Sequence, residues 1–253
     1  MTAVSALVVV HNEEARLRAC LEKLTFADEI VVVLDKCTDG TKAIAAEFTD
    51  RLVEGSWDLE GPRRNTGIAA CAGPWVLEID ADEHVTPELA AEIRRTVAES
   101  AWDWHELPVD NFIGGRLVRH GWGGSFGKSA YPGLFRKGVK TWGPQRVHPA
   151  LAWADGASKG PRLAHPVLHY VDRDISDMVR RLDAYSTAKA RDLRDAGETW
   201  GSTASNVRRL VSRFWKCYVS RKGYREGGYG LLIALFAGLY PLLSHLKAKL
   251  ERE

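Results

Sequence analysis

Cysteine is scarce in this chain of 253 residues, which has four, at positions 20, 37, 71 and 217. They form no CxxC pair, so neither a disulfide framework nor a zinc ribbon is indicated, and a reducing compartment is expected. Basic residues are missing ahead of the first apolar run, in Met1–Ser5, so we expect no secretory signal peptide. These absences predict a protein of the cytoplasmic side.

An excess of charge of one sign is also missing. The chain has 35 basic and 33 acidic residues, a net charge of +2, with 45% hydrophobic and 27% charged residues. This balance gives no reason to expect nucleic acid as a partner. The composition is that of a globular protein and excludes a disordered or low-complexity chain.

Two common nucleotide-binding motifs are absent. No GxGxxG follows a strand pattern, which argues against a dinucleotide-binding dehydrogenase. The segment Gly127–Ser129 resembles the end of a P-loop, but Trp122 stands where the first glycine of that motif is required. A nucleotide would therefore have to be bound in another way.

Strand and helix patterns alternate in the N-terminal part. Short apolar runs rich in β-branched residues predict strands buried on both faces, at positions 6–10, 29–34, 51–54 and 75–79. Helices are expected between them, with Asn12 and either Thr38 or Asp39 as N-caps. Further helices are expected at 175–195 and from 202 onwards. This order predicts an α/β fold built on a parallel sheet.

Polar and acidic residues follow three of these strands, in the segments 11–13, 35–39 and 80–83. Ligands bind at the carboxyl ends of the strands in open parallel sheets. Helix capping explains Asn12 and Thr38, but the three acids within 80–83 repel one another. A divalent cation is the simplest compensating charge, and paired carboxylates suit Mg²⁺ or Mn²⁺ together with substrate phosphates.

Five segments together resemble family 2 glycosyltransferases in their order and spacing. They are Val8–Glu14, Ala27–Val33, Thr38–Thr41, Arg63–Ile68 and Leu77–Glu83. The chain is similar to the branch that includes lipopolysaccharide-core glucosyltransferases, more weakly beyond the fifth segment. The resemblance implies a GT-A fold, Rossmann-like with a mostly parallel sheet and flanking helices, followed here by a helical, amphipathic C-terminal extension. It also implies an inverting transfer from a nucleotide-diphosphate sugar to a lipid-linked or lipopolysaccharide-core acceptor.

The resemblance assigns roles to individual residues. The donor-binding residues that it implies are His11, Asn12, Glu13, Asp35, Arg64, Asn65 and Asp80. The first three match the loop that meets the nucleotide base, and Asp35 matches an acid that contacts the base or ribose. Arg64 and Asn65 match a pair near the nucleotide. In the DxD pair, Asp80 reaches the ribose or sugar and Asp82 holds the metal, Mg²⁺ or Mn²⁺.

The catalytic base is the main departure from the family. Many members carry Val-His-Glu where this chain has Val147–Pro149, so the usual glutamate is replaced by proline. We expect Asp110, at the end of a predicted strand, to take the proton, with His148 second. Other candidates are Glu106, Asp155 and Asp172. The alternative function, favoured by the missing glutamate, is an inactive GT-A module that binds a nucleotide sugar or a protein partner.

The C-terminal segment is both basic and apolar, and its positions 227–246 hold no Asp, Glu, Lys or Arg. We expect a helix lying in a membrane interface, with four leucines facing lipid: Leu231, Leu235, Leu239 and Leu242. Ile233 and Phe236 are expected to insert as well. A single spanning helix and a buried core helix are the alternatives.

This interpretation adds an anionic membrane surface to the partners and predicts a cytoplasmic protein, peripheral on the inner face of the cytoplasmic membrane. The predicted organisation has three parts. Residues 1–100 form the nucleotide-sugar-binding half of the GT-A domain and 101–200 the acceptor-binding half. Residues 201–253 form the membrane-associating helices.

Overall fold

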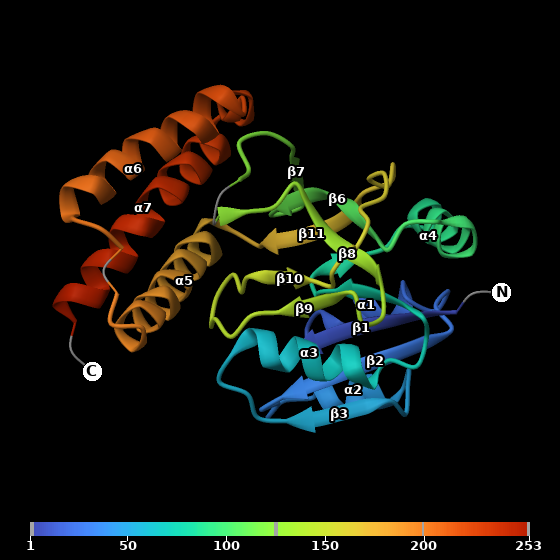
Figure 1. Ribbon diagram of the computed structural model, residues 1–253. Helices are drawn as coiled ribbons and strands as arrows, with labels where there is room; N and C mark the ends of the chain where they lie inside the picture. Colours follow the sequence, from blue (N-terminus) through green and yellow to red (C-terminus); the bar gives the residue numbers. More distant parts are fainter. Residues whose placement is uncertain (1–2, 124–125, 199, 252–253) are drawn as a thin grey trace. The chain divides into compact units, whose positions relative to one another are not determined.

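The computed structural model describes residues 3–123, 126–198 and 200–251 (Figure 1). Its N-terminal elements are β1 Val4–Val10, α1 Leu17–Glu22, β2 Glu29–Asp35, α2 Thr41–Ala46, β3 Leu52–Gly55, α3 Glu60–Ala70, β4 Trp75–Ile79, β5 Glu83–His84 and α4 Pro87–Glu99. Strands follow at β6 Trp104–Ile113, β7 Arg116–Val118, β8 Ala130–Arg136, β9 Lys140–Trp142, β10 Leu151–Trp153 and β11 Val167–Asp172. The helices after them are α5 Ile175–Asp195, α6 Thr203–Trp215, the π-helical turn η2 Lys216–Ser220, the 3-10 turn η3 Gly223–Glu226 and α7 Gly228–Leu250.

Strands β1 and β2 are buried on both faces, as their unbroken apolar runs predict. Val8 and Val10 of β1 join one apolar cluster, whereas Leu7 joins a second cluster together with Val31 and Val33 of β2. Because residues along a strand alternate between its faces, the two clusters lie on opposite sides of the sheet. Apolar packing on both faces therefore fixes the strands, and with them the start of each polar segment that follows.

The sheet is parallel in its N-terminal part and antiparallel beyond it. Its strand order is β3-β2-β1-β4-β8-β6-β11-β5, with β7 paired to β6, while β9 and β10 form a separate pair. Strands β3, β2, β1 and β4 run parallel, and β8 joins the edge of β4 in the antiparallel sense. The predicted α/β sheet is thus confirmed, as a mixed one.

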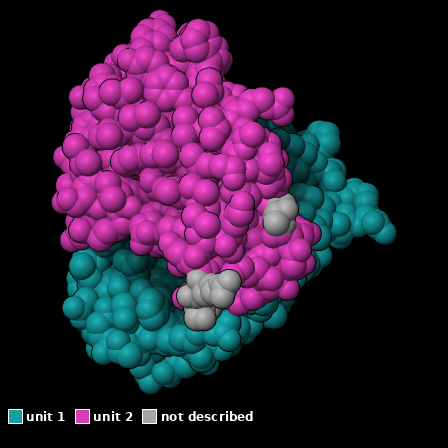
Figure 2. Space-filling view, turned by 90° about the vertical axis from the view of Figure 1, so that its left-hand side faces the viewer, with its two compact units in different colours: residues 1–109, 130–145, 149–169 teal, residues 110–129, 146–148, 170–253 magenta. Residues whose placement is uncertain are grey.

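The chain divides into two compact units, coloured separately in Figure 2. Unit 1 comprises residues 1–109, 130–145 and 149–169, and unit 2 comprises 110–129, 146–148 and 170–253. The chain passes from one unit to the other within β6 and within β11. The units interleave along the sequence, and the predicted division at residues 100 and 200 stays a prediction.

Helix α7 contributes to the apolar core of unit 2. Its side chains Ile233, Ala237 and Tyr240 are buried in one cluster with Met178 and Leu182 of α5. Within the described part of the chain α7 alone is long and apolar enough to cross a membrane, and half of its most apolar stretch is buried inside the protein. These contacts agree with the alternative in which the C-terminal apolar segment is a buried core helix.

The lipid-facing set expected on α7 needs correction. Ile233 and Phe236 are buried, so they are not available for insertion into a bilayer as the chain is folded. Leu231 is exposed, whereas Leu235 and Leu239 pack at the edge of the buried cluster. The sequence pattern of α7 did not distinguish its buried positions from its exposed ones, because the helix is apolar on nearly every side.

Candidate active site

Polar residues gather at the carboxyl ends of β1, β2 and β4 in unit 1, as the sequence predicts. In the parallel ladders Val10 pairs with Leu34, and Val8 pairs with Ile79. The segments that follow these strands therefore begin at the same edge of the sheet, where parallel sheets bind their ligands.

Asp35, the last residue of β2, is held by two donors. Its Oδ1 accepts the backbone N–H of Trp57 at 3.0 Å, and its Oδ2 accepts Arg63 Nη1 at 3.0 Å. Asp35 is buried, so the Arg63 guanidinium supplies the charge that its carboxylate needs. Arg63 lies in one of the five segments that resemble family 2 glycosyltransferases, but no role was predicted for it.

The loop after β1 is tied to β2 and to the loop after it. His11 Nδ1 donates to the carbonyl oxygen of Asp35 at 2.6 Å. Asn12 has φ of 54°, in the left-handed region that asparagine tolerates, and its Oδ1 accepts the Thr38 N–H at 2.8 Å. The backbone N–H of Glu13 donates to Thr41 Oγ1 at 2.8 Å. These bonds fix the loop beside Asp35.

The expected helix caps are wrong in part. Asn12 does not cap a helix, because α1 begins at Leu17 with Arg16 in the capping position. Helix α2 has Gly40 in that position, although Asp39 Oδ1 accepts the N–H of Thr41 at 3.0 Å. Asn12 joins two loops instead of starting a helix.

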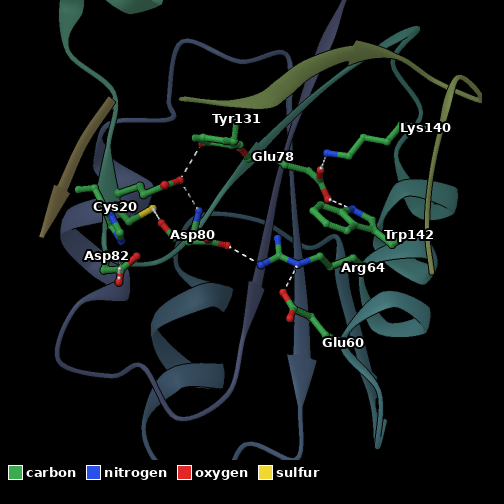
Figure 3. A network of polar contacts seen from close by, with 11 residues as sticks. Cys20, Glu60, Arg64, Glu78, Asp80, Asp82, Tyr131, Lys140 and Trp142 are labelled. Carbon is green, nitrogen blue, oxygen red and sulfur yellow. Dashed lines mark hydrogen bonds and ion pairs between the residues drawn. The ribbon is translucent and has the colours of Figure 1, made fainter. Parts of the chain in front are cut away.

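Helix α3 brings arginines to this edge. A Cβ added to Gly67 of α3 would lie 2.6 Å from Leu7 and 2.8 Å from Val33 side-chain atoms, so glycine is what lets α3 lie so close on β1 and β2. Arg64, one turn earlier, donates from Nε to Glu60 at 2.8 Å and from Nη2 to Asp80 Oδ1 at 3.0 Å (Figure 3). Two predicted donor-binding residues are thus joined directly.

The charge of Arg64 is held by its surroundings. Burial alone would lower the pKa of its guanidinium, but the charges of Asp80 and Glu60 hold that pKa above its usual value. The guanidinium also lies 5.2 Å from the ring centroid of Trp142 in β9, within the range of a cation–π contact. A permanent positive charge with fixed orientation is suited to recognising phosphate groups.

Hydrogen bonds from several elements fix the turn after β4. Glu83, the last acid of the 80–83 segment, is buried, and its Oε2 accepts the Asp80 N–H at 3.0 Å and the Tyr131 hydroxyl at 2.7 Å. The Cys20 thiol donates to the Asp80 carbonyl oxygen at 3.5 Å. Figure 3 shows these contacts converging on the turn that carries Asp80 and Asp82.

Protein groups offset part of the repulsion in this turn. Besides the Arg64–Asp80 pair, Asp82 Oδ2 lies 3.5 Å from Arg16 Nη1 and 3.5 Å from His169 Nε2. Arg16 and Arg64 thus offset part of this repulsion within the protein, and the divalent cation that the acids predict stays a prediction. Sequence spacing gave no sign of Arg16 or His169.

The acids of this turn also act on Glu13, in the loop after β1. Burial raises the pKa of Glu13 above its usual value, and although Arg16 lowers it, the charges of Asp82 and Asp80 raise it further. Within residues 3–123, 126–198 and 200–251 no group of three or more His, Cys, Asp or Glu side chains is arranged to hold a metal ion. The roles of Asp80 and Asp82 in metal binding stay predictions.

Next to Arg64 on α3, Asn65 is hydrogen-bonded to β9, and β9 is in turn joined to β4 by a buried ion pair. Lys140 of β9 pairs with Glu78 of β4, both buried, and Trp142 Nε1 donates to Glu78 Oε1 at 2.9 Å. Asn65 donates to the Trp142 carbonyl oxygen and accepts its N–H, each at 2.9 Å. Asn65 thus fixes β9 with both of its amide atoms, and its predicted contact with the nucleotide stays a prediction.

Comparison with known proteins identifies the family of the N-terminal part of the chain. The sequence model described as glycosyl transferase family 2 matches residues 5–126, which include every one of the strand-end residues from His11 to Asp82. The N-terminal half of this chain is a family 2 glycosyltransferase domain. The predicted enzyme class and the GT-A fold are confirmed.

The relatives of this glycosyltransferase extend over more of the chain. The lipopolysaccharide core biosynthesis glycosyltransferase LpsC of Rhizobium meliloti is 26% identical over 261 residues, covering 96% of this chain and 91% of LpsC. An uncharacterized glycosyltransferase of Rickettsia felis is 26% identical over 229 residues, covering 85% of this chain and 77% of its own. Glucosyl-3-phosphoglycerate synthase from Mycobacterium tuberculosis, solved with Mg²⁺ and uridine diphosphate, is 21% identical, with a TM-score of 0.37 over 46% of this chain and 45% of the synthase.

The two favoured candidates for the base of the glycosyltransferase lie in unit 2. Asp110 is half-buried on β6. His148 is exposed, has φ of 50°, and its ring stands edge-on to Tyr185 and Tyr240, with centroids 5.3 and 5.9 Å apart. A non-glycine residue in this backbone region carries strain, which is common at functional positions. Both residues stay candidates for the base.

Two of the other candidates are engaged in ion pairs. Asp172 is buried and receives both Nε and Nη2 of Arg181, at 3.1 and 2.7 Å. Glu106 pairs with Lys159 and Arg162 at 2.8 and 3.0 Å. The hydrogen bonds and charges of Lys159 and Arg162 hold the pKa of Glu106 below its ordinary value, which makes its carboxylate a weaker base.

Proposed function

We propose that this glycosyltransferase transfers a sugar, with inversion, from a nucleotide-diphosphate sugar to a lipid-linked or lipopolysaccharide-core acceptor. The observation that carries the proposal is the joined cluster at the strand ends of unit 1, where Asp35 is bonded to Arg63 and Asp80 to Arg64. The named role of LpsC in lipopolysaccharide core biosynthesis supports the choice of acceptor.

Each residue of the cluster has a proposed role in binding the donor. Asp35 and the His11–Glu13 loop, tied together through the Asp35 carbonyl oxygen, would contact the base and the ribose. Arg64 would attract the diphosphate with its charge, since one guanidinium offers several donors in a fixed plane. Asp80 would orient the sugar or ribose while Arg64 holds its Oδ1.

A divalent cation fits the acids of this site. Burial, and to a smaller extent the charges of Asp82 and Asp80, raise the pKa of Glu13 although Arg16 lowers it, so several acids lie close together here. Asp82, with Asp80 beside it, would hold Mg²⁺ or Mn²⁺, which are ions that take carboxylate and phosphate oxygens. When bound, such an ion stabilises the charge that develops on a departing diphosphate.

The acceptor half needs a base. The acceptor hydroxyl oxygen attacks the anomeric carbon, the bond from that carbon to the diphosphate oxygen breaks, and the hydroxyl proton passes to the base. Asp110 is the proposed base and His148 the second choice, because Lys159 and Arg162 lower the pKa of Glu106 and both carboxylate oxygens of Asp172 accept from Arg181. A well-placed base contributes about 10²–10⁴-fold to such a step.

The proposed place of action is the inner face of the cytoplasmic membrane, on which a glycolipid acceptor would be presented. The cations of the C-terminal helices favour an anionic surface there. A peripheral attachment is sufficient, because α7 shares the core of unit 2.

Turnover of a panel of nucleotide sugars tests the function. The full-length protein is incubated with each donor and Mn²⁺, with and without a lipopolysaccharide-core acceptor. We expect one nucleotide sugar to be consumed faster when the acceptor is present. If no donor is consumed and none binds in a calorimetric titration, the proposed donor site is wrong, whereas donor hydrolysis that no acceptor accelerates would remove only the acceptor class.

A further inference from the structure

Helix α6 carries an exposed apolar strip. Val207, Val211 and Trp215, spaced four residues apart, are 47%, 61% and 61% exposed. Residues spaced by four lie on one face of a helix, so these side chains form a continuous ridge on the surface of unit 2. Val219, in η2, is exposed beyond the end of the ridge.

The opposite face of α6 is fixed within unit 2. Helices α6 and α7 lie side by side (Figure 1), and a Cβ added to Gly238 of α7 would be 2.7 Å from the Leu210 carbonyl oxygen. The buried Asn206 donates to the carbonyl oxygens of Trp200 and Ser202 at 2.8 and 3.0 Å. The exposed ridge is therefore the outer side of an anchored helix.

The surroundings of the ridge are strongly basic. No Asp or Glu lies between Glu198 and Glu226. The exposed cations of this stretch are Arg208, Lys216, Lys222 and Arg225. Glu226 itself is buried, and its Oε1 accepts the backbone N–H groups of Arg119 and His120 at 3.0 and 2.9 Å. No acid of α6, η2 or η3 thus opposes an anionic partner at this face.

We propose that this face of α6, with the basic residues around it, docks on the surface of an anionic phospholipid bilayer. Valine and tryptophan side chains would enter the boundary between headgroups and acyl chains, where tryptophan is enriched, while the cations contact lipid phosphates. A partner bound by charge alone would not use a ridge of valines. The cations, in turn, distinguish this face from an ordinary apolar protein interface.

The proposal moves the membrane contact from α7 to α6. Ile233 and Ala234 of α7 are fully buried against the same unit, so they would reach lipid only if that core opened. The ridge of α6 reaches lipid without any rearrangement. The inference deepens the proposed function and rests on it for the presence of a lipid-borne acceptor, but the contact itself requires neither donor nor acceptor.

Vesicle sedimentation with full-length protein tests the docking face. The probes are vesicles of phosphatidylcholine alone and of phosphatidylcholine mixed with phosphatidylglycerol, with no sugar nucleotide present. We expect binding to the mixed vesicles only. Val211→Glu should reduce the partition coefficient at least about tenfold, because it removes an inserting side chain and adds a repelled charge.

A matched control uses another exposed valine of unit 2. Val179 on α5 is 49% exposed, and Val179→Glu makes the same change of charge and size outside the ridge. Its partition coefficient should stay within about twofold of the wild type. Thermal unfolding of both variants, with a midpoint like that of the wild type, shows that each one folds.

Three results would overturn the proposal: no binding of the wild type to the mixed vesicles, equal losses in the two variants, or a wild-type dimer that Val211→Glu converts to a monomer. The last would make the ridge a self-association face. Donor binding, measured separately by calorimetry, should be the same in all three proteins. A loss of vesicle binding with intact donor binding therefore separates this proposal from the proposed function.

Discussion

Arg64 Nη2 and Asp80 Oδ1 lie 3.0 Å apart, so that one ion pair joins the first turns of α3 to the turn after β4. We expect Arg64→Ala to weaken donor binding at least about tenfold, because it removes the cation proposed to attract the diphosphate and the bond that this cation donates to Asp80 Oδ1. Arg64→Lys should recover only part of this loss, since an ammonium cannot bridge Glu60 and Asp80 in the same plane. Calorimetric titration of the donor measures both.

The control for Arg64 is Arg51→Ala. Arg51 is an exposed arginine of unit 1 that pairs with Glu29 at 3.1 Å, ahead of β3 and away from the carboxyl ends of the strands. Its loss should leave the donor affinity within about twofold of the wild type. Equal effects of the two substitutions would show that Arg64 has no particular part in binding the diphosphate.

Asp82→Ala should abolish the dependence of nucleotide-diphosphate binding on Mn²⁺. The physical reason is that Asp82 is the proposed metal ligand, while the bonds of Glu83 and Cys20 to the Asp80 backbone remain to hold the turn. Calorimetry with and without Mn²⁺ provides the measurement. Asp50→Ala is the control, because Asp50 is an exposed aspartate at the amino end of β3. Unchanged metal-dependent affinity in Asp82→Ala would assign the metal elsewhere.

Asp110→Asn should lower kcat by roughly 10²-fold or more with little change in donor affinity, whereas His148→Ala should have a smaller effect. Asparagine keeps the size of the side chain but cannot accept the acceptor proton at neutral pH. Steady-state kinetics with the identified donor and acceptor separates kcat from KM. Wild-type turnover in Asp110→Asn would eliminate it and leave His148 and Asp155 as candidates.

Local sequence patterns predicted the regular elements well and the long-range contacts poorly. The strand at 75–79 and the helix at 175–195 were predicted with their observed bounds because an apolar run and a helical period are local properties. The antiparallel pairing of β8 with β4 was not predicted, because a short strand carries no sign of which edge it joins. Likewise α7 has a composition that suits lipid and core equally, and only its neighbours in unit 2 decide between them.

The candidate site shows the same limit. The residues at the strand ends were predicted because each follows a recognisable strand and matches a family motif. Their partners were not: Asn65 bonds the backbone of Trp142, which lies 77 residues away in sequence. The contact between Asp82 and His169 likewise depends on how β11 pairs with β5, which no local pattern encodes.

Glu92 predicts a dependence of stability on pH. Burial alone would raise the pKa of this α4 side chain, but the N–H groups of Ala164 and His165, at 2.8 and 2.9 Å, hold it below its ordinary value of 4.5. Between the folded-state pKa of Glu92 and its ordinary value of 4.5, the unfolded chain therefore binds more protons than the folded one. The contribution of the Glu92 carboxylate to the free energy of unfolding is lost as the pH falls through the folded-state pKa. Glu92→Gln should cost about 1–3 kcal/mol at neutral pH.

Below the folded-state pKa of Glu92 the variant and the wild type should be equally stable, because both then carry a neutral side chain. Urea unfolding at a series of pH values measures the difference. Glu99→Gln, an exposed position at the end of the same helix, is the control and should change stability little at any pH. A difference between Glu92→Gln and the wild type that is constant with pH would show that charge has no part in it.

The ion pair of Lys140 and Glu78 predicts a strongly non-additive pair of substitutions. Both side chains are buried, and Glu78 also accepts Trp142 Nε1 at 2.9 Å. Lys140→Met should destabilise unit 1 by about 3–5 kcal/mol, because it leaves the Glu78 charge buried without its cation. Adding Glu78→Gln removes that charge yet keeps an acceptor for Trp142, so the double variant should regain most of the stability. Urea unfolding of the two single variants and the double variant gives the coupling energy, and losses that simply add would show that the two charges do not depend on each other.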